Sequence, residues 1–296
     1  MRIDLPGRSL HLEVETHGKA SDSAVIMIMG LGMQLIHWPV ELIQALTGAG
    51  FRVVVFDNRD CGLSGTRIER DYTAPGKALL AHTFRRPFRA AYHLSDMAED
   101  TLALADALEI DSFHLVGVSL GGMIAQTLAA RRPDRVVSLA SIMSSAGPDT
   151  APWPNPRIIW KFMRPSPRSG RRQARIDHTV RLLIAIGRLD DKAEISRLRE
   201  RVSAAVDRAC RPEGIARQLM AVLADRDRSA EVARIDCRTL IMHGADDPLV
   251  RPGAAFHLKK LIPHAEMEII EGMAHYLPRG CLPRITSVLV RHLANA

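Results

Sequence analysis

A serine stands between two glycines in the stretch LVGVSLGGMIAQ, residues 115–126, where an apolar run gives way to a helical pattern. Gly117 precedes Ser119 by two positions and Gly121 follows it by two, in a G-x-S-x-G spacing. A serine on such a strand-to-helix turn is held in a strained backbone conformation, and its neighbours must lack side chains so that strand and helix can approach. The pattern predicts a nucleophilic hydroxyl beside a helix amino terminus, whose positive potential favours a developing oxyanion.

A serine hydroxyl is a weak nucleophile, so this chemistry needs a base that takes its proton and an acid that orients the base. Of the 12 histidines, His275 in the stretch GMAHYLP follows the last expected strand by a short loop, which returns it to the sheet edge from which Ser119 projects. His37 and His243 lie near strand ends, where they could line the site without catalysing. His114 and most of the others fall inside expected strands or helices, where a surface or core role is the simpler interpretation.

Two adjacent aspartates, Asp246 and Asp247, stand in the stretch HGADDPLV just beyond another expected strand. Adjacent residues of an extended chain point to opposite sides, so at most one of the two carboxylates faces His275. The chain order is then serine, aspartate, histidine, which is one of the known orders of nucleophile, acid and base. This geometry alone leaves the choice between the two aspartates open.

Short apolar or β-branched runs alternate with helical patterns along the chain, which indicates a parallel sheet covered by helices on both faces. The expected strands span residues 24–29, 52–56, 113–118, 136–143, 239–244 and 267–272. The expected helices span residues 40–49, 95–108, 120–131 and 282–294. Residues 11–16 alternate apolar and polar side chains, as an antiparallel edge strand would.

One interval interrupts this alternation. Residues 148–230 contain no convincing strand; they open on several prolines and continue as helical patterns. We expect this segment to be a helical cap inserted into an α/β core formed by residues 1–147 and 231–296. Sheets of this kind place their sites outside the carboxyl ends of the strands, so the cap is expected to cover that edge. Residues 66–92 are expected to form a second long loop.

A glycine pair in the stretch IMGLGMQL suggests a different class of protein, a dinucleotide-binding enzyme. Gly30 and Gly32 follow an expected strand in GxG spacing, and the next strand ends in Asp57, as in a dinucleotide-binding unit. Leu35 replaces the third glycine of that fingerprint, and the Trp-Pro pair at residues 38–39 interrupts the first turns of the phosphate-binding helix. These departures disfavour a nucleotide-dependent oxidoreductase.

The composition of the chain excludes several other classes of protein. The chain has 296 residues, 47% of them hydrophobic, which is enough for one large core, and no apolar run is long enough to suggest a signal peptide or a membrane span. The four cysteines are far apart without a CxxC pair, which favours a reducing compartment, expected to be the cytoplasm. The formal net charge of +7 is partly local to residues 157–175, which carry no nucleic-acid-binding signature and are interpreted as a solvated basic surface.

The motifs GVSLGG, GADDPLV and GMAHYLP together resemble the elbow, acid loop and histidine loop of the α/β-hydrolases, and the resemblance extends over nearly the whole chain. The segments VIMIMGLGMQLIHWP, FRVVVFDNRDCGLSG and HLSDMAEDTLALADALEID look like the subgroup of aclacinomycin methylesterase-type carboxylesterases. The resemblance implies an α/β-hydrolase fold, a mostly parallel central sheet flanked by helices with an inserted helical cap. In the family's G-x-x-D spacing, Gly244 selects Asp247 as the acid. Asp57 and Arg59, in the DNRDCGLS motif, are interpreted as scaffold.

The resemblance also implies where an oxyanion would be held. By the family pattern, the donors are the backbone N–H groups of Leu31 and Leu120. Gly30 and Gly32 then let the first loop turn sharply enough to aim an N–H at the substrate. Many relatives have His-Gly at this loop, whereas this chain has Met29 before the glycine. Backbone donors do not depend on that side chain.

We therefore expect a serine hydrolase that cleaves carboxylic esters through an acyl-enzyme intermediate, with Ser119, His275 and Asp247 as the catalytic residues. No metal or organic cofactor is expected, and the expected partner is a small-molecule, apolar ester rather than nucleic acid or a membrane. Apolar side chains near the site or in the insertion are the candidates for the substrate pocket, with core packing as the alternative: Met29, Met33, Trp38, Met123, Trp153, Trp160 and Met163.

Other functions share this fold and triad. C–C bond hydrolases and perhydrolases use the same three residue types, and the fold also serves as a ligand-binding module without catalysis, so these functions stand as alternatives. An aspartate at position 119 would have indicated dehalogenase or epoxide hydrolase chemistry, which the serine disfavours. An intact set of serine, aspartate and histidine disfavours the non-catalytic module.

Overall fold

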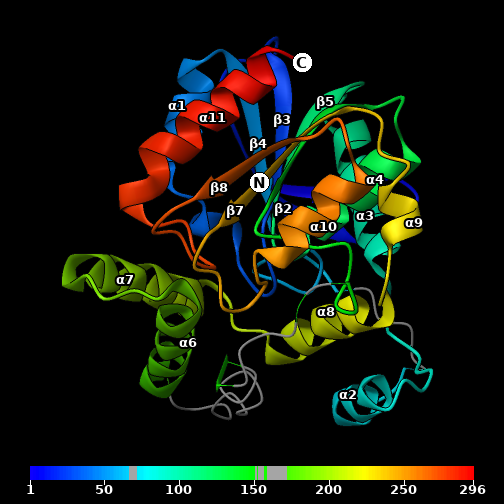
Figure 1. Ribbon diagram of the computed structural model, residues 1–296, viewed down its shortest axis with the longest axis vertical. Helices are drawn as coiled ribbons and strands as arrows, with labels where there is room; N and C mark the ends of the chain where they lie inside the picture. Colours follow the sequence, from blue (N-terminus) through cyan, green and yellow to red (C-terminus); the bar gives the residue numbers. More distant parts are fainter. Residues whose placement is uncertain (67–71, 151, 153–156, 159–171) are drawn as a thin grey trace.

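The computed structural model describes residues 1–66, 72–150, 152, 157–158 and 172–296, and it contains an eight-stranded sheet in the order β1-β2-β4-β3-β5-β6-β7-β8 (Figure 1). The strands are β1 (Arg2–Asp4), β2 (His11–His17), β3 (Ser23–Ile28), β4 (Phe51–Phe56), β5 (Phe113–Val118), β6 (Val136–Ile142), β7 (Arg238–Gly244) and β8 (Glu266–Ile270). β1, β2 and β4 pair antiparallel, and the strands from β4 through β8 run parallel. The expected fold class, a mostly parallel sheet with one antiparallel edge, is confirmed.

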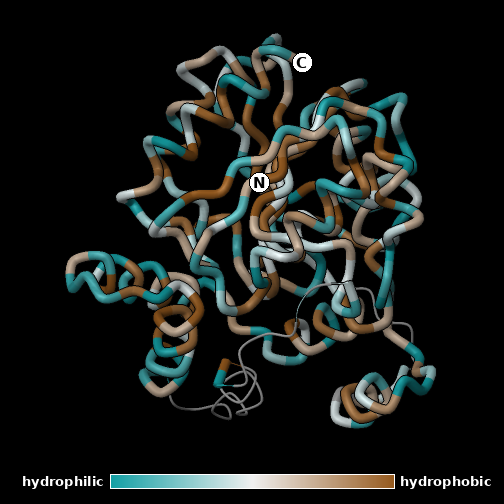
Figure 2. Tube along the Cα trace, viewed as in Figure 1, coloured by the Kyte–Doolittle hydropathy of each residue, from teal (hydrophilic) through white to brown (hydrophobic). Residues whose placement is uncertain are grey.

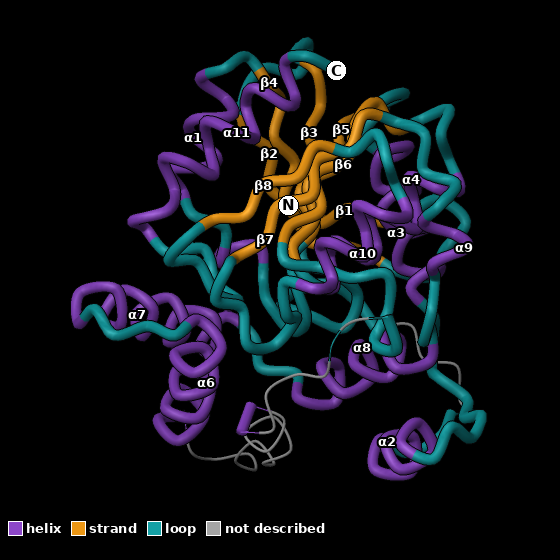
Figure 3. Tube along the Cα trace, in the orientation of Figure 1, coloured by secondary structure: helices purple, strands orange, loops and turns teal. Residues whose placement is uncertain are grey.

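Helices cover both faces of this sheet (Figure 3). One face packs against α1 (Val40–Gly48) and α11 (Leu282–Ala294), and the other against α3 (Leu94–Ala107), α4 (Leu120–Arg131) and α10 (Gly253–Leu261). In β4, Val53 and Val55 belong to the apolar core under α1 and α11, and Val54 belongs to the apolar core under α3, α4 and α10. Because successive strand residues enter two different cores, the central strands are mostly apolar on both faces, as the brown strand segments of Figure 2 indicate.

Between β6 and β7, the described part of the chain is helical. Its helices are α6 (Arg172–Gly187), α7 (Lys192–Arg208), α8 (Pro212–Ala224) and the short α9 (Ser229–Val232). Figure 1 shows α6, α7 and α8 gathered beyond one end of the strands, with α2 (Pro75–Thr83) close to α8. Apolar side chains of α6 and α7, including Ile176, Val180 and Leu198, form a small core of their own.

Several elements were not expected from the sequence. The three residues of β1 are too few for a periodic pattern, α10 was not recognised between two strands, and α2 lies within the segment expected to be a loop. The strand expected to reach residue 272 ends at Ile270, because Gly272 turns the chain with a φ of 72°. The described residues also form two 3-10 turns, η1 (Leu35–His37) and η2 (Arg279–Cys281). None of the described helices is long and apolar enough to cross a membrane.

The junction of β5 and α4 is packed against its neighbours without room for side chains. A Cβ on Gly121, at the start of α4, would lie 2.0 Å from the backbone oxygen of Ile28 at the end of β3. A Cβ on Gly117 would lie 2.2 Å from the backbone oxygen of Gly121. The two glycines of the G-x-S-x-G motif therefore let the helix start directly against the sheet, as the motif predicts.

This close approach predicts a large difference between two glycine substitutions. We expect Gly121→Ala to lower the free energy of unfolding by at least about 1–3 kcal/mol, because the new methyl group must displace backbone atoms. Gly48→Ala is the matched control, since nothing lies within 4 Å of a Cβ at that helical position and alanine is expected to be neutral or stabilising there. Urea unfolding of both variants measures the difference; equal midpoints would contradict the packing described.

Candidate active site

Ser119 occupies the turn between β5 and α4 in a strained backbone conformation, with φ 57° and ψ −117°. Few residues other than glycine adopt a positive φ, so the surrounding structure must hold it. The N–H of Ser119 donates to the carbonyl of Ile142 in β6 (2.9 Å), and its carbonyl accepts from the hydroxyl of Ser144 (2.8 Å). These contacts fix the turn to the adjacent strand and leave the Ser119 hydroxyl at the carboxyl edge of the sheet.

The structure brings His275 and Asp247 to this serine. His275 Nε2 lies 3.0 Å from Ser119 Oγ, and His275 Nδ1 lies 2.7 Å from Asp247 Oδ2. Both His275 and Asp247 are buried, while Ser119 is half-buried. The backbone N–H of His275 also donates to the carbonyl of Ile186 (3.1 Å), so the end of α6 supports the histidine loop. A chain of two short hydrogen bonds thus runs from carboxylate to hydroxyl.

The Asp247 carboxylate is strongly stabilised in its ionised form. Oδ1 accepts the N–H groups of Leu249 and Val250, both at 2.9 Å, and Oδ2 faces His275. Burial disfavours the charge, but the positive potential of His275 and the hydrogen bonds from His243 and His275 outweigh it and lower the pKa of Asp247 to about 2. Asp247 is therefore a permanent anion at neutral pH, suited to orient a histidine and to stabilise its protonated form.

Asp246, the other aspartate of the acid loop, lies elsewhere. Its side chain is half exposed and its Oδ1 accepts a hydrogen bond from Arg188 at 3.0 Å. Its backbone N–H donates to the carbonyl of Met273, which ties the acid loop to the histidine loop. Of the two aspartates between which chain geometry could not choose, Asp247 is the one whose carboxylate contacts His275.

The two histidines expected near the site differ in their surroundings. His243, at the end of β7, is buried; its Nε2 lies 2.7 Å from the carbonyl of Val250 and 3.5 Å from Asp247 Oδ2. It supports the acid loop from behind. His37 in η1 hydrogen-bonds through Nδ1 to the backbone of Gln34, and burial lowers its pKa to about 4, so it is neutral at physiological pH. In the described part of the chain, neither of these two histidines hydrogen-bonds to the serine hydroxyl, which His275 contacts.

The two backbone groups expected to hold an oxyanion flank the serine. Leu120 begins α4, and the loop that carries Leu31 passes so close that a Cβ on Gly30 would lie 3.4 Å from the Cβ of Ser119. The N–H of Met33 donates to the carbonyl of Gly30 (3.1 Å), which closes this loop into a tight turn. In the described part of the chain, the N–H groups of Leu31 and Leu120 donate to no acceptor, so both are free for a ligand.

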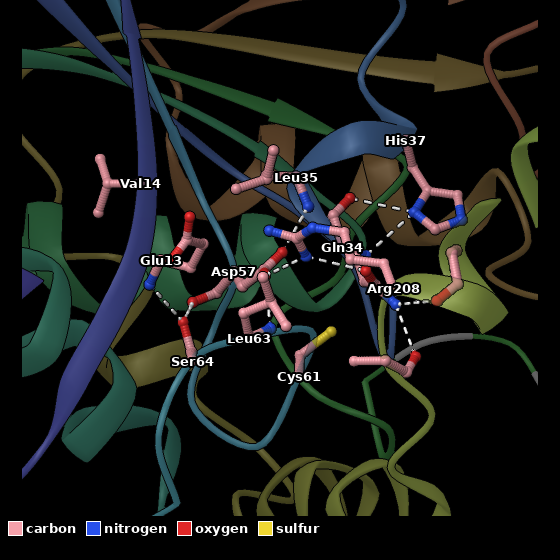
Figure 4. A network of polar contacts seen from close by, with 12 residues as sticks. Glu13, Val14, Gln34, Leu35, His37, Asp57, Cys61, Leu63, Ser64 and Arg208 are labelled. Atoms are coloured by element: carbon pink, nitrogen blue, oxygen red, sulfur yellow. Dashed lines mark hydrogen bonds and ion pairs between the residues drawn. The ribbon is translucent and has the colours of Figure 1, made fainter. Parts of the chain in front are cut away.

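A buried polar network lies under this loop (Figure 4). Asp57 Oδ1 accepts the N–H of Leu35 (2.8 Å), and Asp57 Oδ2 accepts the N–H of Leu63 (2.9 Å) and an N–H of Arg208 (2.5 Å). Arg208 is the last residue of α7 and also donates to Gln34 Oε1 (2.9 Å). The contacts of Asp57 are with other protein groups and agree with the scaffold role interpreted from the sequence.

The residues expected to form a substrate pocket are spread over different environments. Met29 and Trp38 are buried in the core beneath α1 and α11, and Met123 is buried in the core beneath α3 and α4. Met33 is half-buried and packs both against the first of these cores and against the small core of α6 and α7. The other three candidates, Trp153, Trp160 and Met163, lie outside the described residues.

Sequence reasoning missed the polar residues that connect the helices between β6 and β7 to the core. Gln218 in α8 accepts the N–H of Gly32, and Arg217 beside it forms a buried ion pair with Asp60 (2.8 Å). No local motif marks these residues, because their partners lie more than 150 positions away in the chain. Among the described residues, no group of three or more metal-ligating side chains comes together.

The sheet and the arrangement at Ser119 define a class of protein, and comparison with known families agrees with it. Residues 23–278 match the family model described as alpha/beta hydrolase fold. The chain belongs to this family and is a hydrolase of the α/β-hydrolase superfamily.

The proteins similar to this chain include hydrolases of several kinds. Rhodomycin D methylesterase DauP from Streptomyces sp. strain C5 is 27% identical over 94% of this chain and 93% of its own length. A putative carbamate hydrolase, RutD, from Variovorax paradoxus is 33% identical over 47% of this chain and 44% of its own. Among solved structures, a meta-cleavage product hydrolase from Pseudomonas fluorescens superimposes with a TM-score of 0.75 at 20% identity, covering 100% of this chain and 97% of its own. At that identity the superposition establishes the fold alone.

The ionised Asp247 predicts a pH-dependent contribution to stability. Its pKa in the folded protein is about 2, below the ordinary 3.8, so its contribution is fully present above about pH 4 and is lost as the pH falls towards 2. We expect Asp247→Asn to lower the free energy of unfolding by roughly 2 kcal/mol at neutral pH, with the difference from wild type closing near pH 2. Urea unfolding at several pH values measures this. Asp246→Asn is the control, and a difference for Asp247→Asn that stays constant over the whole range would contradict the expectation.

Proposed function

We propose that the protein is a serine hydrolase that cleaves carboxylic esters through an acyl-enzyme intermediate, with Ser119 as nucleophile, His275 as base and Asp247 as the orienting acid. The observation that carries the proposal is the pair of hydrogen bonds at His275, 3.0 Å to Ser119 Oγ and 2.7 Å to Asp247 Oδ2. With Asp247 ionised, Nδ1 of the imidazole is the donor to the carboxylate. The lone pair of Nε2 is then directed to the serine hydroxyl.

In the first half of the proposed cycle, Ser119 Oγ attacks the ester carbonyl while His275 Nε2 takes its proton. The carbonyl oxygen becomes an anion and receives hydrogen bonds from the N–H groups of Leu31 and Leu120. His275 then gives its proton to the leaving alcohol, and the acyl group stays on Ser119. Asp247 stabilises the imidazolium during these steps without taking a proton itself.

In the second half, His275 takes a proton from a water molecule, whose oxygen attacks the acyl-enzyme carbonyl. The same two N–H groups hold the second oxyanion. Return of the proton to Ser119 Oγ releases the carboxylic acid and restores the resting state. Apart from the ester and one water molecule, the proposed cycle uses side chains and backbone groups of this chain.

We also propose that residues 148–230 form a cap over this site. The support is that the helices α6 and α8 contact the loops that carry the reacting groups. Ile186 at the end of α6 accepts the N–H of His275, and Gln218 of α8 accepts the N–H of Gly32. A cap in this place would choose the alcohol and acyl groups that reach Ser119 and would keep bulk water out.

Similarity supports an ester as the substrate and leaves a carbamate as the alternative. The methylesterase DauP is 27% identical over 94% of this chain, and a putative carbamate hydrolase RutD from Stutzerimonas stutzeri is 26% identical over 96% of it. The meta-cleavage product hydrolase shares the fold at 20% identity, which carries no information on substrate. We further propose that Met33, an apolar side chain between the core under α1 and α11 and the core of α6 and α7, contacts an apolar ester.

The nucleophile is tested directly with Ser119→Ala. We expect wild-type protein to hydrolyse p-nitrophenyl esters of some acyl length, and the variant to be slower by roughly 10⁴-fold or more, because the covalent route is removed. A fluorophosphonate should label wild-type protein at Ser119 and leave the variant unlabelled, as read by intact mass. Ester hydrolysis that survives in Ser119→Ala would refute the proposed nucleophile. Labelling of Ser119 without ester turnover would support Ser119 as the nucleophile and reject an ester as the substrate. Carbamate and vinylogous 1,5-diketone substrates would then be assayed.

The adjacent aspartates provide a matched pair for the acid. We expect Asp247→Asn to reduce kcat by roughly 10⁴-fold, because an amide cannot stabilise the imidazolium and leaves His275 in the wrong tautomer. Asp246→Asn removes the same charge one residue away from a half-exposed position and should leave kcat close to that of wild type. Initial rates of both variants on the best p-nitrophenyl ester give the comparison. Equal losses in the two variants would reject Asp247 as the specific partner of His275.

A further inference from the structure

The loop that carries one oxyanion donor is a four-residue turn, Gly30 to Met33. The N–H of Met33 donates to the carbonyl of Gly30 (3.1 Å), and Gly32 at the third position has a φ of 67°. Leu31 at the second position is not among the residues with positive φ. A positive φ at the third position only is the pattern of a type II turn. Type I and type II turns differ by a flip of the central peptide unit, here the one between Leu31 and Gly32.

Gln218 binds that central peptide unit. Its Oε1 accepts the N–H of Gly32 at 2.9 Å, and the side chain is fully buried. In the flipped turn, the carbonyl of Leu31 would replace this N–H and would face Oε1, acceptor against acceptor. The cost of leaving these groups unpaired in a buried position is about 1–3 kcal/mol, so the contact selects one orientation of the peptide.

The orientation of Gln218 is itself fixed by a second contact. Its Nε2 donates to the carbonyl of Arg59 at 2.7 Å. Turning the amide over would place Oε1 against that carbonyl, again acceptor against acceptor, so the hydrogen-bond network allows a single assignment of the amide. Arg59 is rigid because its guanidinium is held by the buried Asp100. The scaffold loop therefore dictates which end of Gln218 meets the turn.

The contact is one of close packing as well as hydrogen bonding. A Cβ on Gly32 would lie 2.8 Å from the side chain of Ile215, which is one turn before Gln218 on α8. The helix is anchored independently through Arg217, which pairs with both carboxylate oxygens of Asp60 at 2.8 Å. Loss of the Gln218 amide should therefore loosen the turn while α8 stays in place.

We propose that Gln218 is a positioning residue for the oxyanion hole: by binding the Leu31–Gly32 peptide at one end of its amide and the Arg59 carbonyl at the other, it fixes the turn in place, with the Leu31 N–H directed at the substrate oxygen. The inference rests on the proposed function, since it presumes attack by Ser119 on a carbonyl. The peptide plane of Gly30 and Leu31 links the two observations. Its carbonyl is bound by Met33 inside the turn, so its N–H points the opposite way, out of the turn.

The test is Gln218→Met, which keeps the length of the side chain and removes both hydrogen bonds. We expect kcat on the best p-nitrophenyl ester to fall roughly 10- to 100-fold. Complete removal of an oxyanion donor lowers kcat by about 10² to 10³, and a misplaced donor should lower it by less than that. KM should change by less than about twofold, since the donor acts on the oxyanion and not on the bound ester. Binding of a trifluoromethyl ketone, whose serine adduct is an oxyanion, should weaken by the same factor as kcat.

Two further variants make the result decisive. Gln218→Asn keeps a buried amide but is too short to reach both partners, so it should show the same loss of kcat even if the methionine variant folds poorly. Gln173→Met is the matched control, because Gln173 lies exposed on α6 and, among the described residues, hydrogen-bonds to Asp177 of its own helix. Its kcat should equal that of wild type. Circular dichroism and thermal unfolding establish that each variant compared is folded.

The possible outcomes separate the two proposals. Wild-type turnover with unchanged kcat in the folded Gln218 variants overturns the positioning role and leaves the esterase proposal intact. A rise in KM with unchanged kcat and unchanged ketone binding also overturns it, because this is the result of a substrate contact. If wild-type protein neither hydrolyses esters nor reacts with a fluorophosphonate at Ser119, the proposed function fails and the positioning role falls with it.

Discussion

The left-handed backbone at Ser119 is the constraint on which the rest of the site depends. A serine with a φ of 57° is unfavourable by roughly 1–3 kcal/mol, so its surroundings must hold it there. Two features do so. The N–H of Ser119 is hydrogen-bonded to a carbonyl of β6, and α4 starts so close to the end of β3 that position 121 has no space for a side chain. The same sharp turn leads directly into α4, whose first residue is Leu120. The strain, the proposed nucleophile and the proposed donor at Leu120 therefore depend on one backbone conformation.

The parts of this arrangement that are local in sequence could be predicted from it. The G-x-S-x-G spacing, the apolar run before it and the loop positions of Asp247 and His275 each report a backbone geometry within a few residues. The central strands were expected almost to the residue because they are buried on both faces, as Val53, Val54 and Val55 illustrate.

The parts that join distant segments could not be predicted. Gln218 and Gly32 are separated by 186 positions, and Arg208 and Asp57 by 151, without any pattern that pairs them. Buried glutamine and arginine side chains satisfy backbone groups of loops, and such partners are fixed only when the chain is folded. Chain geometry likewise could not choose between Asp246 and Asp247, because the choice depends on which carboxylate meets a histidine 28 residues further on. β1 was missed for the simpler reason that three residues carry little periodicity.

The distribution of the site along the chain has a consequence for biosynthesis. Ser119 lies 156 residues before His275, so a growing chain carries the proposed nucleophile without its proposed base for roughly ten to thirty seconds at ordinary rates of translation. The sheet grows outward from its centre during that time, since β7 and β8 are made last and bring the acid and the histidine with them. In the proposed mechanism, Ser119 therefore gains its base only when the final strand and the loop after it dock at the edge of the sheet.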